Sequence, residues 1–422
     1  MIRIAIATLG CKTNTFESSA IIHQFDPNLY CLVPFSEPAD IYIINTCTVT
    51  GRTDYKSRNL IRRILERKQA DPSIRVVVTG CYAQRNPDEI RGMGEIDLIV
   101  DNQNKQDIAR LLSDPDYSFS NIMSAKDFSY RPVGKMVEHS RAFQKIQDGC
   151  DFRCSYCAIP YGRGNSRSAR FDDVISQARL FMENGYREIV LGGVNLGLYK
   201  DGHHGLADVV EALQGMDGLE LIRLSSLEPQ LVSSELLSRI SACGKLCPHF
   251  HLALQSGCDG VLKRMNRDYT AQDVKSLIQE IYRLFPNVAL GMDVIVGFPG
   301  ENDAESEATR LFLSELDIAY LHVFSYSRRW GTPAASMPDQ VSNQEKKQRA
   351  QVLNKLSDKK KSAYMERLIS RGVKLKGISE KMVRGHCTFL SDHYIRVYTK
   401  DSFNQGELLE KVPTQKYLNG VR

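Results

Sequence analysis

The first part of the chain alternates short apolar runs with segments of helical spacing. The runs are rich in β-branched residues and almost continuously apolar, which is typical of parallel strands covered on both faces. We therefore predict an α/β class of fold that begins with a parallel-sheet domain of Rossmann or flavodoxin type over residues 1–115. The predicted strands are Ile2–Thr8, Ile41–Asn45, Arg75–Thr79 and Ile96–Val100, and the predicted helices include Phe16–Phe25 and Arg52–Gln69.

The same alternation resumes near residue 139 and continues to about residue 340. Six apolar runs are separated by amphipathic segments such as Asp173–Asn184 and Ala271–Leu284. Six βα units predict an open (β/α)6 barrel, a shortened relative of the eightfold barrel. The predicted strands are Phe143–Gln147, Glu188–Gly192, Leu219–Ser225, His249–Gln255, Ala289–Val296 and Tyr320–Phe324.

Three segments depart from this pattern. Residues 116–138 contain Arg-Pro-Val-Gly and predict a linker. Residues 341–370 are rich in Lys and Gln and predict a basic helical connector, whose simplest interpretation is a solvated helix. Residues 371–422 show few helix signals and predict a small β-barrel, with strands at Val373–Ile378, Tyr394–Tyr398 and Leu408–Val412.

Composition limits the classes of protein that fit. The 422 residues are 42% hydrophobic and 25% charged, with a formal net charge of +5. This mild positive charge permits nucleic-acid binding without requiring it. No apolar run approaches the ~18 residues that span a bilayer, and the start lacks a signal peptide. We expect a cytoplasmic protein with no membrane partner. Eleven cysteines, an odd number, argue against a disulfide framework and for buried, catalytic or metal-bound thiols.

Cys150, Cys154 and Cys157 follow the first predicted barrel strand with CxxxCxxC spacing. Three thiolates can hold three irons of a 4Fe-4S cluster, whereas electron-carrying ferredoxins use four. The open iron can chelate the amino and carboxylate groups of S-adenosylmethionine (SAM), whose reductive cleavage gives a 5′-deoxyadenosyl radical. A zinc site usually needs a second cysteine pair downstream. The triad stands where barrel enzymes place their chemistry, so we favour a radical SAM cluster.

Cys11, Cys47 and Cys81 each close a strand–turn segment in the N-terminal domain. Ligands of open α/β sheets gather at the carboxyl ends of the strands, so these thiols should converge. They could hold a second 4Fe-4S cluster; the alternative is isolated buried cysteines. The remaining cysteines show no such pattern and are interpreted as structural: Cys31, Cys243, Cys247, Cys258 and Cys387.

At these motifs the chain resembles the methylthiotransferase family of radical SAM enzymes over nearly its full length. The resemblance includes Leu9-Gly-Cys11-Lys-Thr-Asn14, Asn45-Thr-Cys47, Thr79-Gly-Cys81, Gln147-Asp-Gly-Cys150 through Pro160, Arg163-Gly164, Arg167-Ser168 and His249–Met265. It implies an N-terminal methylthiotransferase domain, a radical SAM barrel and a C-terminal TRAM domain. It also implies two 4Fe-4S clusters, one SAM that donates a methyl group and another that yields the radical.

The resemblance implies SAM contacts as well. Tyr156 lies between two cluster cysteines where the family's backbone meets the adenine. Gly192 and Gly193 are expected to line the methionine amino group. Ser225, Glu228 and Gln255 are expected near the ribose or the methionine. Alone, each of these glycine-rich or polar strand ends is ordinary turn chemistry.

Three segments resemble the branch that methylthiolates N6-threonylcarbamoyladenosine 37 of tRNA: Leu191-Gly-Gly-Val-Asn195, Leu224-Ser-Ser-Leu-Glu-Pro229 and Cys247-Pro-His-Phe-His-Leu252. Alternatives are methylthiolation of isopentenyladenosine 37 or of a ribosomal-protein aspartate, and a cluster protein without turnover. Ser325 and Trp330 stand where members of the family usually have proline, and the stretch from Gly385 to Tyr394 also differs from the usual pattern. These differences concern the residues that would bind the substrate.

The expected partners are the tRNA anticodon stem-loop and an external electron donor such as flavodoxin or ferredoxin; the sulfur donor is unknown. The C-terminal segment interleaves cations with aromatics, a pattern that can hold RNA by stacking and phosphate contacts. The alternative is a solubilising surface. The residues are Lys374, Lys376, Lys381, Arg384, Arg396 and Lys400, with Phe389, Tyr394 and Tyr398.

Overall fold

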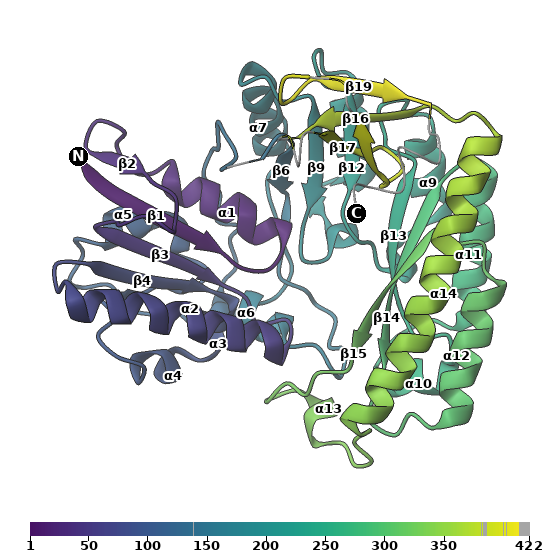
Figure 1. Ribbon diagram of the computed structural model, residues 1–422, viewed down its shortest axis with the longest axis horizontal. Helices are drawn as coiled ribbons and strands as arrows, with labels where there is room; N and C mark the ends of the chain where they lie inside the picture. Colours follow the sequence, from purple (N-terminus) through teal and green to yellow (C-terminus); the bar gives the residue numbers. More distant parts are fainter. Residues whose placement is uncertain (138, 381, 383–385, 400, 402, 413–422) are drawn as a thin grey trace.

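A computed structural model describes residues 1–137, 139–380, 382, 386–399, 401 and 403–412. Figure 1 shows the N-terminal sheet beside a larger set of strands covered by helices, with the C-terminal strands across one end of that larger set. Among the described residues, no helix is both long and apolar enough to cross a membrane.

The N-terminal sheet has five parallel strands in the order β2-β1-β3-β4-β5. Tyr42 and Ile44 of β3 belong to one apolar cluster with Ile61, whereas Ile43 belongs to another with Ile21. Both faces are therefore covered, as the continuous apolar runs predicted. The elements are β1 (Ile2–Thr8), α1 (Lys12–Ile22), β2 (Tyr30–Leu32), β3 (Ile41–Thr46), α2 (Gly51–Ala70), β4 (Arg75–Gly80), α3 (Cys81–Arg85), α4 (Pro87–Arg91), β5 (Leu98–Ile99), η1 (Lys105–Asp107) and α5 (Ile108–Leu111).

Six parallel strands form the open barrel. They pair as β6-β9-β12 and β13-β14-β15, and two isolated parallel bridges, Ile222 to Leu246 and Leu227 to Leu252, join the two groups. The end strands β6 and β15 do not pair with each other in the described chain. The barrel strands are β6 (Ala142–Lys145), β9 (Glu188–Gly192), β12 (Leu221–Leu224), β13 (His249–Gln255), β14 (Ala289–Val296) and β15 (Tyr320–Ser325).

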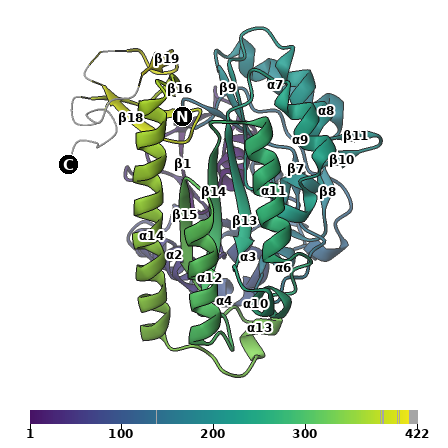
Figure 2. The same cartoon turned by 90° about the vertical axis from the view of Figure 1, so that its right-hand side faces the viewer.

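Amphipathic helices cover the outside of these strands, and Figure 2 shows several of them as a layer in front of the sheet. They are α7 (Phe171–Glu183), α8 (Leu206–Gln214), α9 (Ser234–Ser241), α11 (Ala271–Leu284) and α12 (Asp303–Glu315). The shorter elements are η2 (Ile122–Ser124), β7 (Gln147–Asp148), α6 (Ile159–Arg163), β8 (Arg167–Ser168), η3 (Leu196–Leu198), β10 (Lys200–Asp201), β11 (His204–Gly205), η4 (Pro229–Leu231), α10 (Asp259–Arg264) and α13 (Pro333–Ser336).

The lysine-rich connector is one long helix, α14 (Asn343–Ser370). Ser342 caps its first turn by accepting a hydrogen bond from the amide of Glu345, which strengthens the start of the helix. The helix packs along β15, where the Ser357 hydroxyl bonds both the amide and the carbonyl of Leu321, at 2.8 and 3.1 Å. One side is therefore buried against the barrel, and the exposed lysines lie on the rest of the helix.

The C-terminal strands form an antiparallel sheet in the order β18-β17-β16-β19. They are β16 (Leu375–Ser379), β17 (Cys387–Ser391), β18 (Arg396–Thr399) and β19 (Leu408–Lys411). The sequence pattern missed β17, and Tyr394 lies in a turn with φ of +59° rather than in a strand. Lys381, Arg384 and Lys400 lie outside the described residues.

A buried arginine joins this sheet to the barrel. Arg223 of β12 donates to the carbonyl oxygens of Ser391 and Asp392 at 2.9 and 3.3 Å, and it pairs with Glu188 at 2.8 Å. The ring of Tyr394 stacks on His249 with centroids 4.3 Å apart. The C-terminal sheet therefore closes the end of the barrel at which strands β12 and β13 begin.

Candidate active site

Cys11, Cys47 and Cys81 follow β1, β3 and β4 at the carboxyl edge of the N-terminal sheet. Gly10 has φ of +102°, and a Cβ there would lie 2.6 Å from the sulfur of Cys47, so this loop needs glycine. Burial, followed by the neighbouring thiols of Cys81 and Cys11, raises the pKa of Cys47 to about 12. The structure thus brings the three thiols of this set to one edge.

Asn14 fixes the loops that carry two of these cysteines. Its side-chain amide donates to the carbonyl oxygens of Leu9 and Thr46 at 2.7 and 3.0 Å. In return, the amide of Asn45 donates to the carbonyl oxygen of Asn14 at 3.1 Å. These buried bonds satisfy loop groups that have no partner in the sheet, and they make the edge a rigid platform.

Cys150, Cys154 and Cys157 lie in the loop between β7 and α6. Asn195 and Arg267 reach the sulfurs of Cys150 and Cys154 at 3.6 and 3.5 Å. Burial, followed by the thiol of Cys154, raises the pKa of Cys157 to about 12. Burial also raises the pKa of Cys150 and Cys154, so a cationic centre that binds these thiols would have to displace their protons.

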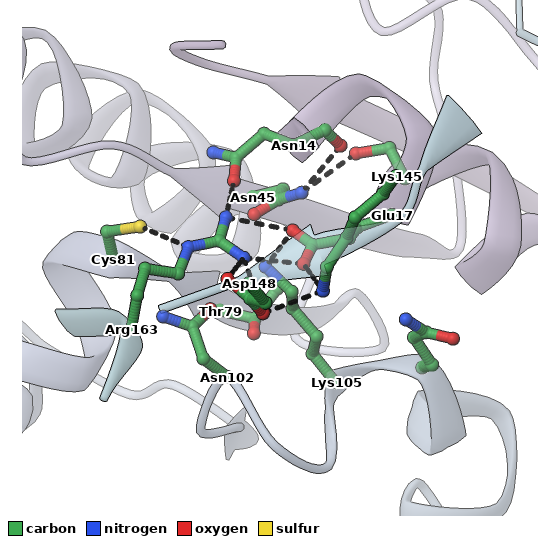
Figure 3. Close-up of polar contacts among 12 residues, drawn as sticks. Asn14, Glu17, Asn45, Thr79, Cys81, Asn102, Lys105, Lys145, Asp148 and Arg163 are labelled. Atoms are coloured by element: carbon green, nitrogen blue, oxygen red, sulfur yellow. Dashed lines mark hydrogen bonds and ion pairs between the residues drawn. The ribbon is translucent and has the colours of Figure 1, made fainter. Parts of the chain in front are cut away.

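A buried network of charges connects the N-terminal domain to the barrel (Figure 3). Glu17 of α1 lies at its centre and accepts from Arg163 at 2.5 and 2.9 Å and from Lys145 at 2.7 Å. Lys105 also pairs with Glu17, and Lys145 pairs with Asp148 at 2.7 Å. Burial opposes ionisation of Glu17, but Arg163, Lys105 and Lys145 outweigh it and hold the pKa of this carboxyl well below its usual range.

The network carries more positive than negative charge. Its cations are Lys105, Lys145, Arg163 and Arg167, and its carboxylates are Glu17 and Asp148. Uncompensated charge in a protein interior is costly. Arg163 directs Nε to the sulfur of Cys81 at 3.0 Å, so an anionic sulfur centre bound at this position would supply the missing negative charge. The donor set therefore fits a thiolate-bound cluster.

A cavity opens between the two cysteine sets. Val49 and Thr50, just after Cys47, line one side, and Tyr156 and Cys157 line the other. Further lining residues are Ala158, Ile159, Gln255, Asp293, Ile295, Phe324, Ser325, Tyr326, Ser327 and Arg329. A group bound here would touch both cysteine-bearing loops.

Arg329 ties the two domains together at this cavity. Its guanidinium bonds the hydroxyl of Thr48 at 2.6 Å and the carboxylate of Asp54 at 2.7 Å. The amide of Gly51 donates to the hydroxyl of Ser327 at 3.0 Å nearby. The segment after β15 is thus fixed against the start of α2, and the amide of Ala334 in the same segment donates to the carbonyl oxygen of Ser155 in the other loop at 2.8 Å.

The six residues predicted to contact SAM do not all meet. Tyr156 and Gln255 line the cavity between the cysteine sets. Ser225 lines a different cavity, described below. Glu228 pairs with Arg267 at 2.6 Å outside the lining of either cavity.

The two glycines after β9 are also outside these linings. A Cβ on Gly193 would lie 2.8 Å from Oε1 of Gln147, which accepts a hydrogen bond from the amide of Asn195 at 2.7 Å. Gly193 therefore lets β9 pass close to the loop of Cys150, and Gly192 has only a carbonyl oxygen within 4 Å of its Cβ position. Gln255 has φ of +68°, a strained conformation that is found most often at functional sites.

Sequence reasoning missed the charges around the cysteines. Glu17, Lys105 and Lys145 stand in segments whose charged residues would ordinarily be solvated, and no local spacing marks them as buried. Arg163 and Arg167 occurred only within the resemblance to a family. A signal for the second cavity was present: His249 and His251 alternate along β13 and therefore face the same side.

Comparison with known proteins agrees with the two-part organisation. Residues 145–313 match the radical SAM superfamily, and residues 3–101 match a family described as uncharacterized protein family UPF0004. Among solved structures, the radical S-adenosylmethionine methyltransferase TsrM from Kitasatospora setae, with cobalamin and a [4Fe-4S] cluster bound, has a TM-score of 0.60 at 12% identity, covering 79% of this chain and 76% of TsrM. That likeness shows the fold. The match to the radical SAM superfamily gives the class: the protein is a radical SAM enzyme.

More similar relatives show which kind of radical SAM enzyme this is. The threonylcarbamoyladenosine tRNA methylthiotransferase MtaB of Aquifex aeolicus is 34% identical over 96% of this chain and 99% of its own length. The protein of the same name from Bacillus subtilis is 38% identical over 86% and 82%. A tRNA-2-methylthio-N(6)-dimethylallyladenosine synthase of Cereibacter sphaeroides is 31% identical over 96% and 94%. The chain belongs to the tRNA methylthiotransferase family, whose members use SAM and [4Fe-4S] clusters.

Proposed function

We propose that this tRNA methylthiotransferase acts on N6-threonylcarbamoyladenosine at position 37 and produces 2-methylthio-N6-threonylcarbamoyladenosine. The observation that carries the proposal is the cavity shared by the loops of Cys47 and Cys157. A transfer that needs a sulfur source and a radical source requires both within reach of one base. The relatives named for the threonylcarbamoyl substrate, at 34% and 38% identity, support this substrate over dimethylallyladenosine.

In this proposal each cysteine set holds one cluster. Cys150, Cys154 and Cys157 would hold the cluster that binds SAM, and the other set, Cys11, Cys47 and Cys81, would hold the auxiliary cluster. When bound, these groups supply the 5′-deoxyadenosyl radical and the methylthio group. Asn195 and Arg267 would donate to sulfurs of the first cluster, and Arg163 to a sulfur of the second.

The chain's own residues position the reactants. Tyr156 and Gln255 would face SAM, and Ile295 and Phe324 would form an apolar side of the same cavity. Arg329 would keep the two loops at a fixed separation through Asp54. The remaining predicted SAM contacts lie outside the lining of this cavity, and Ser225 lines the second one: Gly192, Gly193, Ser225 and Glu228.

The proposal includes two partners. The enzyme would bind the anticodon stem-loop of tRNA and would receive electrons from an external donor such as flavodoxin or ferredoxin. Because the substrate is tRNA, we place the enzyme in the cytoplasm. A strain that lacks the gene for this protein tests the substrate. Mass spectrometry of its tRNA nucleosides should show loss of 2-methylthio-N6-threonylcarbamoyladenosine and accumulation of N6-threonylcarbamoyladenosine. Loss of the dimethylallyl product instead, or an altered ribosomal-protein aspartate with normal tRNA, would identify one of the other branches.

Complementation of the same strain distinguishes the roles of the two cysteine sets. The Cys47→Ala protein should still form 5′-deoxyadenosine from SAM in vitro under reducing conditions, because the barrel set is intact. It should not restore the methylthio product in the deletion strain. Restoration by this variant would contradict the auxiliary role of the N-terminal cysteines.

A further inference from the structure

A second cavity adjoins the first. Asp293 lines both of them, and Lys12, the residue after Cys11, lines the second. The other lining residues come from the barrel and the C-terminal sheet: Leu224, Ser225, Ser226, His249, His251, Tyr320, His322 and Tyr394. A base bound between the cysteine sets could therefore extend a substituent into this space.

The residues that line this cavity carry polar side chains, with the exception of Leu224. The Ser225 hydroxyl and Nδ1 of His249 are buried and have no hydrogen-bond partner among the described residues. His249 is only 4% exposed. A buried polar atom without a partner is costly, so these two atoms point to a ligand that can donate or accept hydrogen bonds.

The other polar groups are already connected to one another. Asp293 accepts from Nε2 of His251 at 2.8 Å and lies 3.5 Å from Nδ1 of His322. Nδ1 of His251 contacts the Tyr320 hydroxyl at 3.1 Å, so both ring nitrogens of His251 are occupied. The carboxylate of Asp293 is thus oriented by the imidazoles; it keeps its negative charge, so an anionic ligand needs a cation in this cavity.

Lys12 is the cation that this arrangement leaves available. It forms no ion pair with any carboxylate in the described part of the chain. Arg223 lies near enough to interact with it, but Arg223 is itself paired with Glu188. The cavity therefore offers one unpaired ammonium group beside two unpartnered hydrogen-bonding atoms.

We infer that this cavity binds the threonyl part of the substrate, with Lys12 pairing to its carboxylate and Ser225 and His249 bonding its hydroxyl or ureido group. The inference rests on the proposed function. A threonylcarbamoyl group carries a carboxylate and a hydroxyl, whereas a dimethylallyl group is a hydrocarbon. A hydrocarbon would leave Lys12, Ser225 and His249 desolvated without partners, so the same contacts reject it.

An anionic oxygen could come from three sources: the threonyl carboxylate, the SAM carboxylate or an RNA phosphate. Reconstituted full-length enzyme is assayed on anticodon stem-loops that carry threonylcarbamoyladenosine or its carboxamide analogue. For the wild type, the carboxamide should raise KM about ten- to a hundredfold, the range for a hydrogen bond to a charged group. Lys12→Met should raise KM for the acid by the same factor and leave KM for the carboxamide unchanged. Lys12→Arg should restore part of the discrimination.

Lys275→Met, an exposed lysine on α11, is the matched control and should keep the discrimination. Because Lys12 adjoins a proposed ligand, iron content and SAM-derived 5′-deoxyadenosine are measured for each variant. Ser225→Ala, which is remote from the cysteines in sequence, should weaken both substrates about equally by a smaller factor. An equal loss on acid and carboxamide for Lys12→Met would assign Lys12 to a phosphate, and a raised SAM dissociation constant would assign it to SAM; either result overturns the inference.

Stoichiometric zinc in the purified protein that is lost in His322→Gln would also overturn it, because the histidines would then be metal ligands. Failure of the proposed function looks different. In that case the wild type would leave the threonylcarbamoyl stem-loop unmodified and would methylthiolate a dimethylallyladenosine stem-loop.

Discussion

Nε of Arg163 lies 3.0 Å from the sulfur of Cys81 and donates to it. Arg163 ends the short helix that follows the barrel cysteines, whereas Cys81 begins the helix after β4 of the other domain. One barrel residue therefore contacts a proposed ligand of the auxiliary cluster. The same guanidinium is fixed by Glu17, so its orientation is determined by both domains.

The first prediction concerns the potential of the auxiliary cluster. Arg163→Lys keeps the positive charge but loses the N–H directed at the sulfur. Hydrogen bonds to cluster sulfurs favour the reduced state, so the midpoint potential of this cluster should fall. A redox titration followed by electron paramagnetic resonance measures it in the Cys150/Cys154/Cys157→Ala background, where only the auxiliary cluster is present. An unchanged potential would mean that the hydrogen bond does not act on the cluster.

The second prediction concerns stability. Glu17→Gln removes the central carboxylate and leaves several buried cations without a partner. Breaking a buried ion pair from one side typically costs about 3–5 kcal/mol of unfolding free energy. Glu89→Gln is the control, because Glu89 is exposed and lies 3.4 Å from a half-buried Arg58, and pairs near the surface contribute about 0–1 kcal/mol. Urea denaturation of the cluster-free proteins compares the two. Equal effects would show that the network does not stabilise the fold.

The third prediction concerns the two sets of thiols. Reconstituted wild type should bind about eight irons as two 4Fe-4S clusters. Replacing Cys150, Cys154 and Cys157 together by Ala should leave about four, and replacing the N-terminal set should do the same. Iron analysis and ultraviolet–visible spectra measure this. Replacing Cys243 and Cys247 together should not lower the iron content. A barrel-set variant that retains all its iron would show that the ligands are elsewhere.

The fourth prediction concerns RNA. Lys374 and Lys376 lie near Glu410, and Arg396 pairs with Glu380, so the charge of these three cations is partly compensated within the sheet. If they contact phosphates, Lys374→Gln with Lys376→Gln should weaken tRNA binding and reduce the salt slope by about 0.7–0.9 for each phosphate that is no longer neutralised. Binding at several salt concentrations measures both quantities. An unchanged slope would mean that other residues bind the RNA.

These point variants are preferable to deleting residues 371–422, because deletion would leave the buried Arg223 without its two carbonyl partners.

The sequence predicted most of the fold because apolar periodicity reports directly on strands and helices. It also predicted where the cysteines stand, since the ends of parallel strands share an edge. It did not predict the network around Glu17, because alternation does not distinguish an inward lysine such as Lys145 from a solvated one. It missed β17 because Cys387–Ser391 directly follows a polar stretch, and it took Tyr394 for a strand residue although its backbone is left-handed. The second cavity required four barrel strands, the start of α1 and the C-terminal sheet to be assembled in space.

The ring of Tyr394 has a further consequence. Tyr394 lies in the turn between β17 and β18 of the C-terminal sheet, stacks on His249 and lines the second cavity. A chimera that took its C-terminal sheet from a dimethylallyladenosine synthase would therefore also exchange one wall of the pocket inferred to hold the substituent. If the C-terminal sheet also contacts the RNA, Tyr394 would couple RNA binding to the choice of modified base, and a chimera would change both properties together.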